Sequence, residues 1–139
     1  MKEVTQWMIN SFDLENKGYD FMGYTFSKPN QLSFHHLIIP KRECPQAGLG
    51  DGYILWNGAI LKQLTSHDYL HLIEQIDKDT FWKITKQMII ENRKGNLDLQ
   101  QLKQIRYFLE IFEKTHKNDT TKEGKKLIKT MYTTDRIPL

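Results

Sequence analysis

The sequence has few of the features that would cross-link the chain or anchor it in a membrane. Its single cysteine, Cys44, has no second cysteine with which to form an internal disulfide. No apolar run approaches the roughly 18 residues of a membrane-spanning helix, and no charged-then-apolar leader follows Met1. These absences predict a cytoplasmic protein without a membrane partner.

The composition is typical of a folded globular domain. Hydrophobic residues make up 39% of the chain and charged residues 27%, which excludes disordered, collagen-like and disulfide-framework classes. A chain of 139 residues is expected to form one domain. A chain of this size buries on folding roughly two-thirds of the surface that it exposes when unfolded, so it can fold without cross-links.

The net charge of +3 is unevenly distributed along the chain. Residues 1–116 carry 14 basic and 14 acidic side chains, whereas residues 117–139 carry six basic and three acidic ones. The sequence therefore predicts a single domain over 1–116 and a basic C-terminal tail over 117–139. Such a tail can attract nucleic acid through its phosphates, although solvated lysine-rich tails are also common.

The first half of the chain predicts short strands separated by loops. After an amphipathic stretch over 4–12, the aromatic residues in 19–26 favour one or two short strands. The run 32–39 has the length and composition of a strand, and the apolar run 53–56 is expected to pair with it as an antiparallel hairpin. Between them, residues 41–52 contain one proline and three glycines, which predicts a loop long enough to suggest a function.

The second half predicts three helices. Thr65 and Asp68 fit a capping box before apolar residues at helical spacing, so a helix is expected to begin near His67. Two further helices are expected over 80–92 and 98–115, each with a stripe of core positions. Large side chains on these helices are interpreted as packing residues without a cofactor role: Trp82, Met88 and Phe108.

Four of the five histidines fall within 37 residues of one another, as two pairs. His67 and His71 are four positions apart on the expected helix, which places their Cβ atoms about 5–6 Å apart, a spacing that lets two imidazoles reach one metal ion. His35 and His36 are neighbours on the expected strand and must point to opposite faces, so they need different roles. A His-x-x-x-His pair alone is also typical of an ordinary helix surface. The order strand, loop, strand, helix brings three imidazoles together and leaves one free, which predicts a metal site with a base beside it.

In this order of elements the sequence resembles the HNH endonuclease superfamily. The resemblance covers residues 34–73 and lies in three segments: FHHLIIP from Phe34, NGAIL from Asn57 and HDYLH from His67. Its all-histidine set is most similar to the nuclease domains of bacterial colicins. The resemblance implies an α+β fold in which a ββα-metal hairpin-helix unit is extended by C-terminal helices over 79–116.

The resemblance also implies roles for individual residues. His36 would be the general base that activates water, and His35, His67 and His71 would hold one divalent metal ion. Asn57 would constrain the loop and the base, or contribute a ligand where the ligand set is smaller. Nitrogen ligands suit zinc, nickel or cobalt better than magnesium, so zinc or nickel is expected to bind tightest, while magnesium or manganese could support activity.

The expected function is metal-dependent hydrolysis of DNA. Lys41 and Arg42, at the mouth of the loop, are candidate contacts to backbone phosphates, and Lys62 is a further candidate. Two alternatives stay open: a nucleic-acid-binding or regulatory module with a structural metal, and a ribonuclease that uses the same site. The small size of the chain predicts low sequence specificity or a partner protein that supplies targeting, and no recognisable reading helix indicates which bases would be read.

Overall fold

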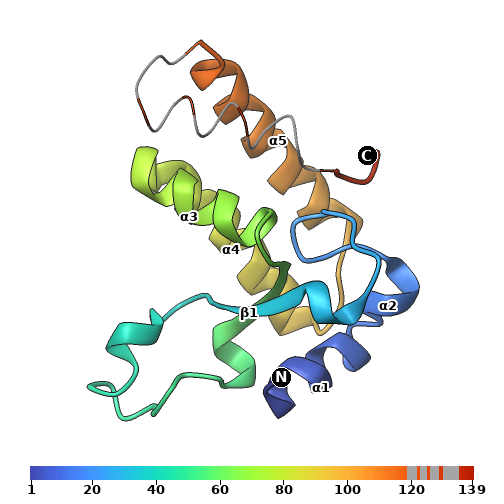
Figure 1. The fold of residues 1–139 in the computed structure, drawn as a ribbon, viewed down its shortest axis with the longest axis vertical. Helices are drawn as coiled ribbons and strands as arrows, with labels where there is room; N and C mark the ends of the chain where they lie inside the picture. The colour runs from blue at the N-terminus through green and yellow to red at the C-terminus, as the bar shows by residue number, and fades with distance from the viewer. Residues whose placement is uncertain (119–121, 123–124, 126–128, 130–134) are drawn as a thin grey trace.

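A computed structural model describes residues 1–118, 122, 125, 129 and 135–139 of the chain. Within this part the helices and strands are α1 (Glu3–Ser11), α2 (Leu14–Lys17), β1 (Leu32–His36), β2 (Gly58–Lys62), α3 (Ser66–Ile76), α4 (Lys78–Lys94) and α5 (Leu99–His116). Figure 1 shows the hairpin between α1 and α2 on one side and the three longer helices on the other, with the loop that joins the strands extending away from them. The architecture is α+β, as the sequence predicts. None of the described helices combines the length and apolar character needed to cross a bilayer.

The second strand of the hairpin differs from the one that the sequence predicts. β1 pairs with β2 in antiparallel register, and His36 lies opposite Gly58. The run 53–56 is not a strand and leads instead into a short 3-10 turn. At position 58 the ring of Phe34 fills the space where a side chain would lie, so the backbone can approach β1 only because the residue is glycine.

The aromatic segment 19–26 is a loop organised around a buried carboxylate, and the strands predicted there are wrong. Asp20 is completely buried, and its Oδ1 accepts hydrogen bonds from two backbone N–H groups of its own loop at 2.9 Å. Its Oδ2 accepts from the backbone N–H of Lys62 at 2.8 Å and from the hydroxyl of Ser66. Because Lys62 ends β2 and Ser66 begins α3, Asp20 fixes the orientation of α3 relative to the hairpin.

Helix α3 begins where the sequence predicts, but without the predicted capping box. The side chain of Thr65 makes no cap hydrogen bond, and its hydroxyl donates to the carbonyls of Lys62 and Gln63 at 3.3 and 3.4 Å. The hydroxyl of Ser66 faces Asp20 instead. A long-range contact has therefore replaced the local cap.

Helices α4 and α5 confirm the predicted core stripes, with the following residues buried: Phe81, Ile84, Met88, Leu102, Ile105, Leu109 and Phe112. Asp77 and Asp98 cap the two helices, each accepting a hydrogen bond from a backbone N–H of the first turn. Gly95 ends α4 with a left-handed φ of 71°. Trp82 does not belong to the stripe. It is 52% exposed, so its interpretation as a packing residue is wrong.

The described end of the predicted basic tail lies against the domain. The backbone N–H of Ile137 donates to the carbonyl of Gly23 at 2.9 Å, and Arg136 donates to both carboxylate oxygens of Glu113 at 3.0 Å. Most of the tail, at 119–121, 123–124, 126–128 and 130–134, lies outside the described residues.

Candidate metal centre

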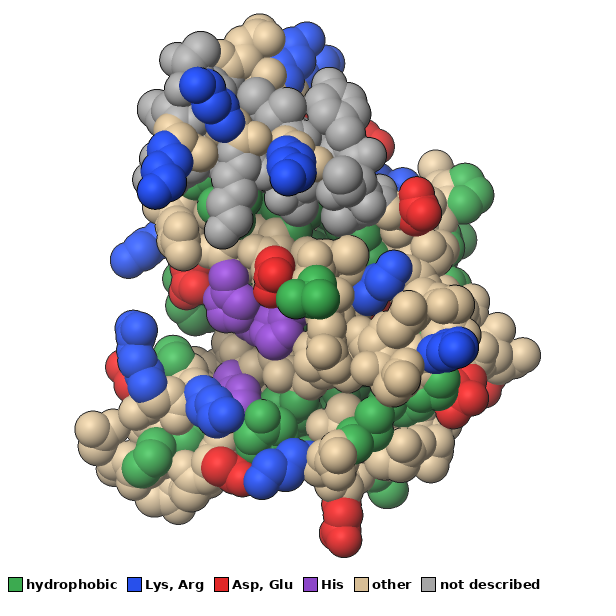
Figure 2. All heavy atoms as spheres, in the orientation of Figure 1, with side chains coloured by type: hydrophobic (Ala, Val, Ile, Leu, Met, Phe, Trp, Pro, Cys, Tyr) green, Lys and Arg blue, Asp and Glu red, His purple; other side chains and the backbone are tan. Residues whose placement is uncertain are grey.

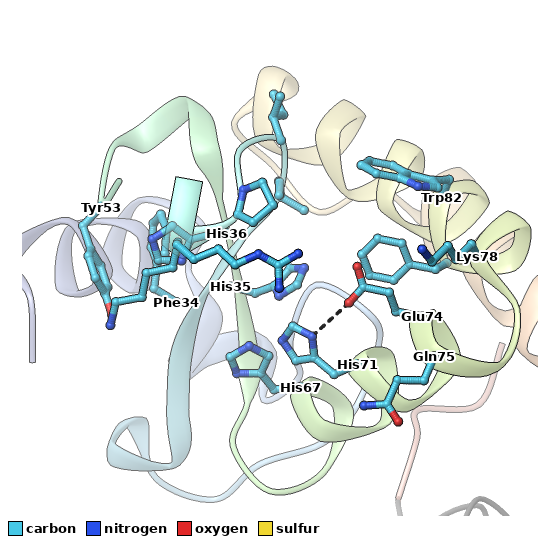
Figure 3. A pocket seen from close by; sticks show the side chains of 16 residues that line it. Phe34, His35, His36, Tyr53, His67, His71, Glu74, Gln75, Lys78 and Trp82 are labelled. Carbon is cyan, nitrogen blue, oxygen red and sulfur yellow. Dashed lines mark hydrogen bonds and ion pairs between the residues drawn. The ribbon is translucent and has the colours of Figure 1, made fainter. Parts of the chain in front are cut away.

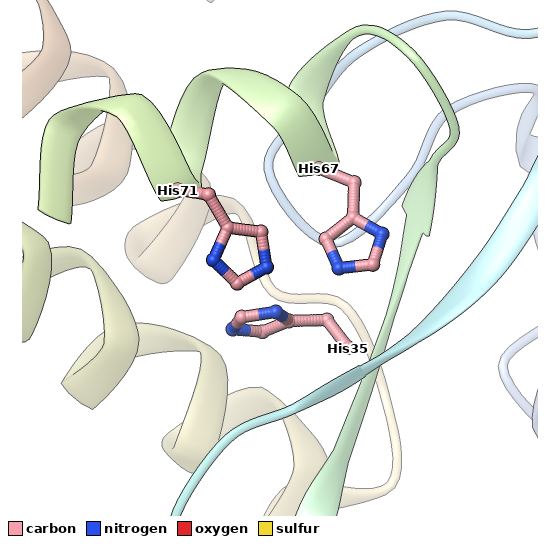
Figure 4. Close-up of side chains that lie close together, drawn as sticks. All are labelled: His35, His67 and His71. Carbon is pink, nitrogen blue, oxygen red and sulfur yellow. The ribbon is translucent and has the colours of Figure 1, made fainter. Parts of the chain in front are cut away.

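Three histidines converge on one point between the hairpin and α3. β1 contributes His35, and α3 contributes His67 and His71 from consecutive turns (Figure 4). One nitrogen from each ring lies within 4.8 Å of the others, and the ring centroids are 5.0 to 5.2 Å apart. The predicted convergence is confirmed, and the three rings are close enough to hold one metal ion.

The hydrogen bonds around His67 determine which of its nitrogens is free. Ser33 Oγ lies 2.8 Å from His67 Nδ1 and 3.3 Å from the carbonyl oxygen of Leu61. The carbonyl can only accept, so the single hydroxyl proton of Ser33 is donated to it. His67 Nδ1 must then carry a proton and donate to Ser33, which leaves the lone pair on Nε2. This is the tautomer that a metal-ligating histidine held by a second partner adopts.

The other two rings also present a nitrogen to the cluster. His35 is only 2% exposed, and its Nε2 has no hydrogen-bond partner among the described residues. A buried ring nitrogen without a partner is unfavourable, and the ring of His35 is one of the three that offer a nitrogen to the cluster. His71 Nδ1 lies 3.4 Å from the carboxylate of Glu74, which accepts a hydrogen bond from it, so Nε2 is the nitrogen of His71 that is left free.

Burial keeps two of these imidazoles in the form that binds metal. Desolvation, followed by the nearby rings of His67 and His71, lowers the pKa of His35 well below its ordinary value of 6.5. Desolvation and then His71 lower the pKa of His67 to about 4. Both rings are therefore neutral at neutral pH, so metal binding requires no proton release from them.

His36 lies outside the cluster. Its ring packs at steep angles against Phe34 and Tyr53, with centroid distances of 5.0 and 4.9 Å. Its Nε2 lies 2.9 Å from the backbone carbonyl of Asp51, which can only accept, so Nε2 carries the proton and Nδ1 keeps its lone pair. The alternation along β1 thus separates His36 from His35, as predicted. Its role as a base stays a prediction.

Asn57 is a clamp for the loop that follows β1. The side chain is completely buried, and its Oδ1 accepts from the backbone N–H groups of Ile38 and Ile39 at 3.0 and 2.8 Å. Its Nδ2 donates to the carbonyls of Ile39 and Gly52 at 3.0 and 3.3 Å. The hydrogen-bonding groups of the Asn57 side chain are thus used inside the loop, and none of these bonds goes to His35, His67 or His71. Of the two roles that the resemblance allows, this geometry fits the constraint of the loop.

A cleft of about 690 Å³ lies over the cluster, between the loop after β1 and helices α3 and α4 (Figure 3). Figure 2 shows the histidine side chains beside this hollow. The basic side chains that line it are Lys41, Arg42 and Lys78, and Glu74 is its acidic one. Lys62 does not line the cleft and lies at the far end of the hairpin. The structure thus brings Lys41 and Arg42 to the site and leaves Lys62 away from it.

Sequence reasoning missed three residues that position the site. Ser33 lies two positions before His35 and therefore shares its face of β1, a signal that could have identified it. Asp51 holds His36 through its backbone carbonyl, which no side-chain pattern indicates. Asp20 joins the hairpin to α3 across 42 positions of sequence, which no local pattern shows.

Comparisons with protein-family models, curated protein sequences and solved structures gave no match to this chain. The site must therefore be interpreted from its own geometry. Three imidazoles, one with an unpartnered buried nitrogen, fit one ion that accepts nitrogen ligands.

Proposed function

We propose that this chain is a metal-dependent endonuclease of the HNH type that hydrolyses phosphodiester bonds in DNA. One observation carries the proposal: three imidazoles converge at the floor of a basic cleft, and a fourth imidazole lines the same cleft without joining them. A cluster that served only to hold the fold would be expected to enclose its ion with four protein ligands. Among the described residues this cluster has three, and one of them, His71, is half exposed.

His35, His67 and His71 would hold the metal ion in this proposal. When bound, the ion would supply positive charge that stabilises the charge developing on the phosphate and on the leaving oxygen. Nitrogen ligands favour zinc or nickel, whereas magnesium or manganese would be held by fewer protein ligands and more water.

The protein's own residues would perform the remaining steps. His36 would accept the proton of the attacking water at Nδ1, the nitrogen that its bond to Asp51 leaves free. The Asp51 carbonyl would keep the other ring proton in place and stabilise the imidazolium. Lys41 and Arg42 would bind phosphates that flank the scissile bond. The expected products carry a 5′ phosphate.

Plasmid cleavage by the full chain tests this proposal. Protein stripped of metal would be reloaded with zinc, nickel, magnesium or manganese and incubated with supercoiled DNA. His36→Ala is expected to slow cleavage by about 10²- to 10⁴-fold while zinc content and melting temperature stay close to those of the parent. His116→Ala, which removes the one histidine outside the two pairs, is the matched control and should cut at the parental rate. Equal rates for His36→Ala and the parent would refute the mechanism.

Two parallel measurements address the alternative functions. Cleavage of RNA in place of DNA would favour a ribonuclease with the same site. Unfolding of the whole domain when zinc is removed, without cleavage under any condition, would favour a structural metal in a binding module.

A further inference from the structure

We infer that the cleft receives an unpaired DNA strand and that Trp82 stacks on one of its bases. The inference rests on the proposed function for the hydrolysis of DNA at the histidines, but its evidence lies on helix α4, which forms another wall of the cleft. Trp82 lines the cleft from α4 and is 52% exposed, although tryptophan is among the side chains that gain most from burial.

The surroundings of Trp82 leave the indole available to a ligand. Its neighbour Phe81 meets it at 5.3 Å with the ring planes 79° apart, so the two rings are not stacked face to face. Lys78 lies one helical turn earlier and lines the same cleft. Figure 3 shows Trp82 and Lys78 on α4, across the cleft from Tyr53. An exposed ring with a cation one turn away is the pair of groups that a nucleotide requires, one for the base and one for the phosphate.

The facing wall holds positive charge. Lys41 lines the cleft and places its ammonium group 5.5 Å from the centroid of the Tyr53 ring. Lys2, which lies outside the cleft in an ion pair with Asp51, is 5.1 Å from the same centroid. Tyr53 therefore holds cations at the rim of the cleft and does not offer a free face for stacking. Together with Arg42, Lys41 gives the wall the character of a phosphate-binding surface, and Trp82 supplies the aromatic surface on the other side.

An unpaired strand fits this arrangement better than a duplex does. Bases in a duplex are stacked on one another, so their faces are hidden and only their edges and the phosphates are accessible. Stacking on Trp82 requires an exposed base face, which an unpaired strand offers at every position. A cleft of about 690 Å³ is also of the size that takes small ligands, so it has room for a short piece of one strand.

Fluorescence anisotropy with a labelled single-stranded oligodeoxynucleotide, and with the duplex of the same sequence, tests the inference. The binding measurements use zinc-loaded full chain in the His36→Ala background, so that cleavage does not interfere. Trp82→Ala is expected to weaken single-strand binding by about 5- to 150-fold and duplex binding much less. Trp82→Phe, which keeps an aromatic face, should restore most of the affinity. Trp7→Ala is the matched control, because Trp7 is 54% exposed on α1 and does not line the cleft.

The salt dependence of binding distinguishes a loss of base stacking from a general disruption of the binding site. Trp82→Ala should leave the slope of log affinity against log salt unchanged, whereas Lys78→Ala should reduce it by about 0.7. Single-strand binding by Trp82→Ala that equals binding by Trp7→Ala, or an equal loss of duplex and single-strand binding, would overturn the inference. A parent protein that binds single strands through Trp82 but cuts no DNA would refute the proposed nuclease alone. If the protein cuts DNA but its single-strand binding does not depend on Trp82, the inference alone is refuted.

Discussion

Replacement of Asn57 by alanine should open the loop after β1 without disturbing the metal ligands. The substitution removes the acceptor for the N–H groups of Ile38 and Ile39 and the donor to the carbonyls of Ile39 and Gly52. A buried polar group without a partner costs about 1–3 kcal/mol. Ile38 and Ile39 are half-buried, so water can reach part of the gap, and the two N–H groups together contribute about 2–4 kcal/mol to the closed loop.

The single cysteine reports this opening directly. Cys44 is completely buried in the loop, where its Sγ donates to the carbonyl of Pro40 at 3.3 Å and lies 3.9 Å from Asn57 Nδ2. A thiol reagent reacts with it only when the loop opens, so the labelling rate follows the population of the open form. A loss of about 2–4 kcal/mol corresponds to a labelling rate about 30-fold to several hundred-fold higher.

The assay compares thiol labelling with zinc affinity in three variants. Asn57→Ala should label faster while its zinc dissociation constant stays within about twofold of the parent value, since no side-chain hydrogen bond of Asn57 goes to the three histidines. Asn57→Asp keeps an oxygen for the two N–H groups and should label at an intermediate rate. Asn10→Ala, on the exposed side of α1, is the control. If Asn57→Ala labels at the parental rate, or if it loses zinc affinity without labelling faster, Asn57 does not hold the loop closed.

Two further predictions concern the histidine cluster. Ser33→Ala removes the partner that fixes the tautomer of His67, and it should weaken zinc binding by about 10- to 100-fold in a chelator competition, whereas Ser33→Thr, which keeps the hydroxyl, should restore most of the affinity. The metal-free protein should lose stability as pH falls through the window from 6.5 toward 4, because the pKa of His67 is about 4 when folded and 6.5 when unfolded, so only the unfolded chain gains the proton. Urea unfolding at pH 7.5 and pH 5 should show His67 contributing up to about 2 kcal/mol of this loss. The pH dependence of the parent minus that of His67→Asn isolates this share, and a difference near zero would contradict the lowered pKa of His67.

Local spacing was sufficient to predict the histidine cluster. The four-residue separation of His67 and His71 and the adjacency of His35 and His36 determine their relative directions as soon as the elements are assigned. The strand partner could not be predicted in this way. The run 53–56 has the local character of a strand, but the pairing depends on the ring of Phe34 filling the space beside Gly58, 24 positions later. That contact forms only when the hairpin is closed.

Helix periodicity contained a signal that the interpretation of Trp82 overlooked. Phe81, Ile84 and Met88 follow the core stripe at spacings of three and four, and Trp82 is displaced from that stripe by one residue, about 100° around the helix. Its position relative to Lys78, four residues earlier, was already the better guide to the face on which it lies. The capping box failed for a different reason. Thr65 and Asp68 satisfy the pattern, but a buried carboxylate from far along the sequence binds the neighbouring Ser66.

The different roles proposed for His35 and His36 follow from two simple constraints. Successive side chains on β1 point to opposite faces, so one ring is buried against α3, where desolvation lowers the pKa of His35, and the other lies against the loop. The partners of the rings then select the free nitrogen. Ser33 and Glu74 hold Nδ1 of His67 and His71 and leave Nε2, whereas the Asp51 carbonyl holds Nε2 of His36 and leaves Nδ1. The proposed function can therefore assign a metal ligand and a proton acceptor to two adjacent histidines, because the strand separates them and the hydrogen bond to the Asp51 carbonyl leaves the lone pair of His36 on Nδ1.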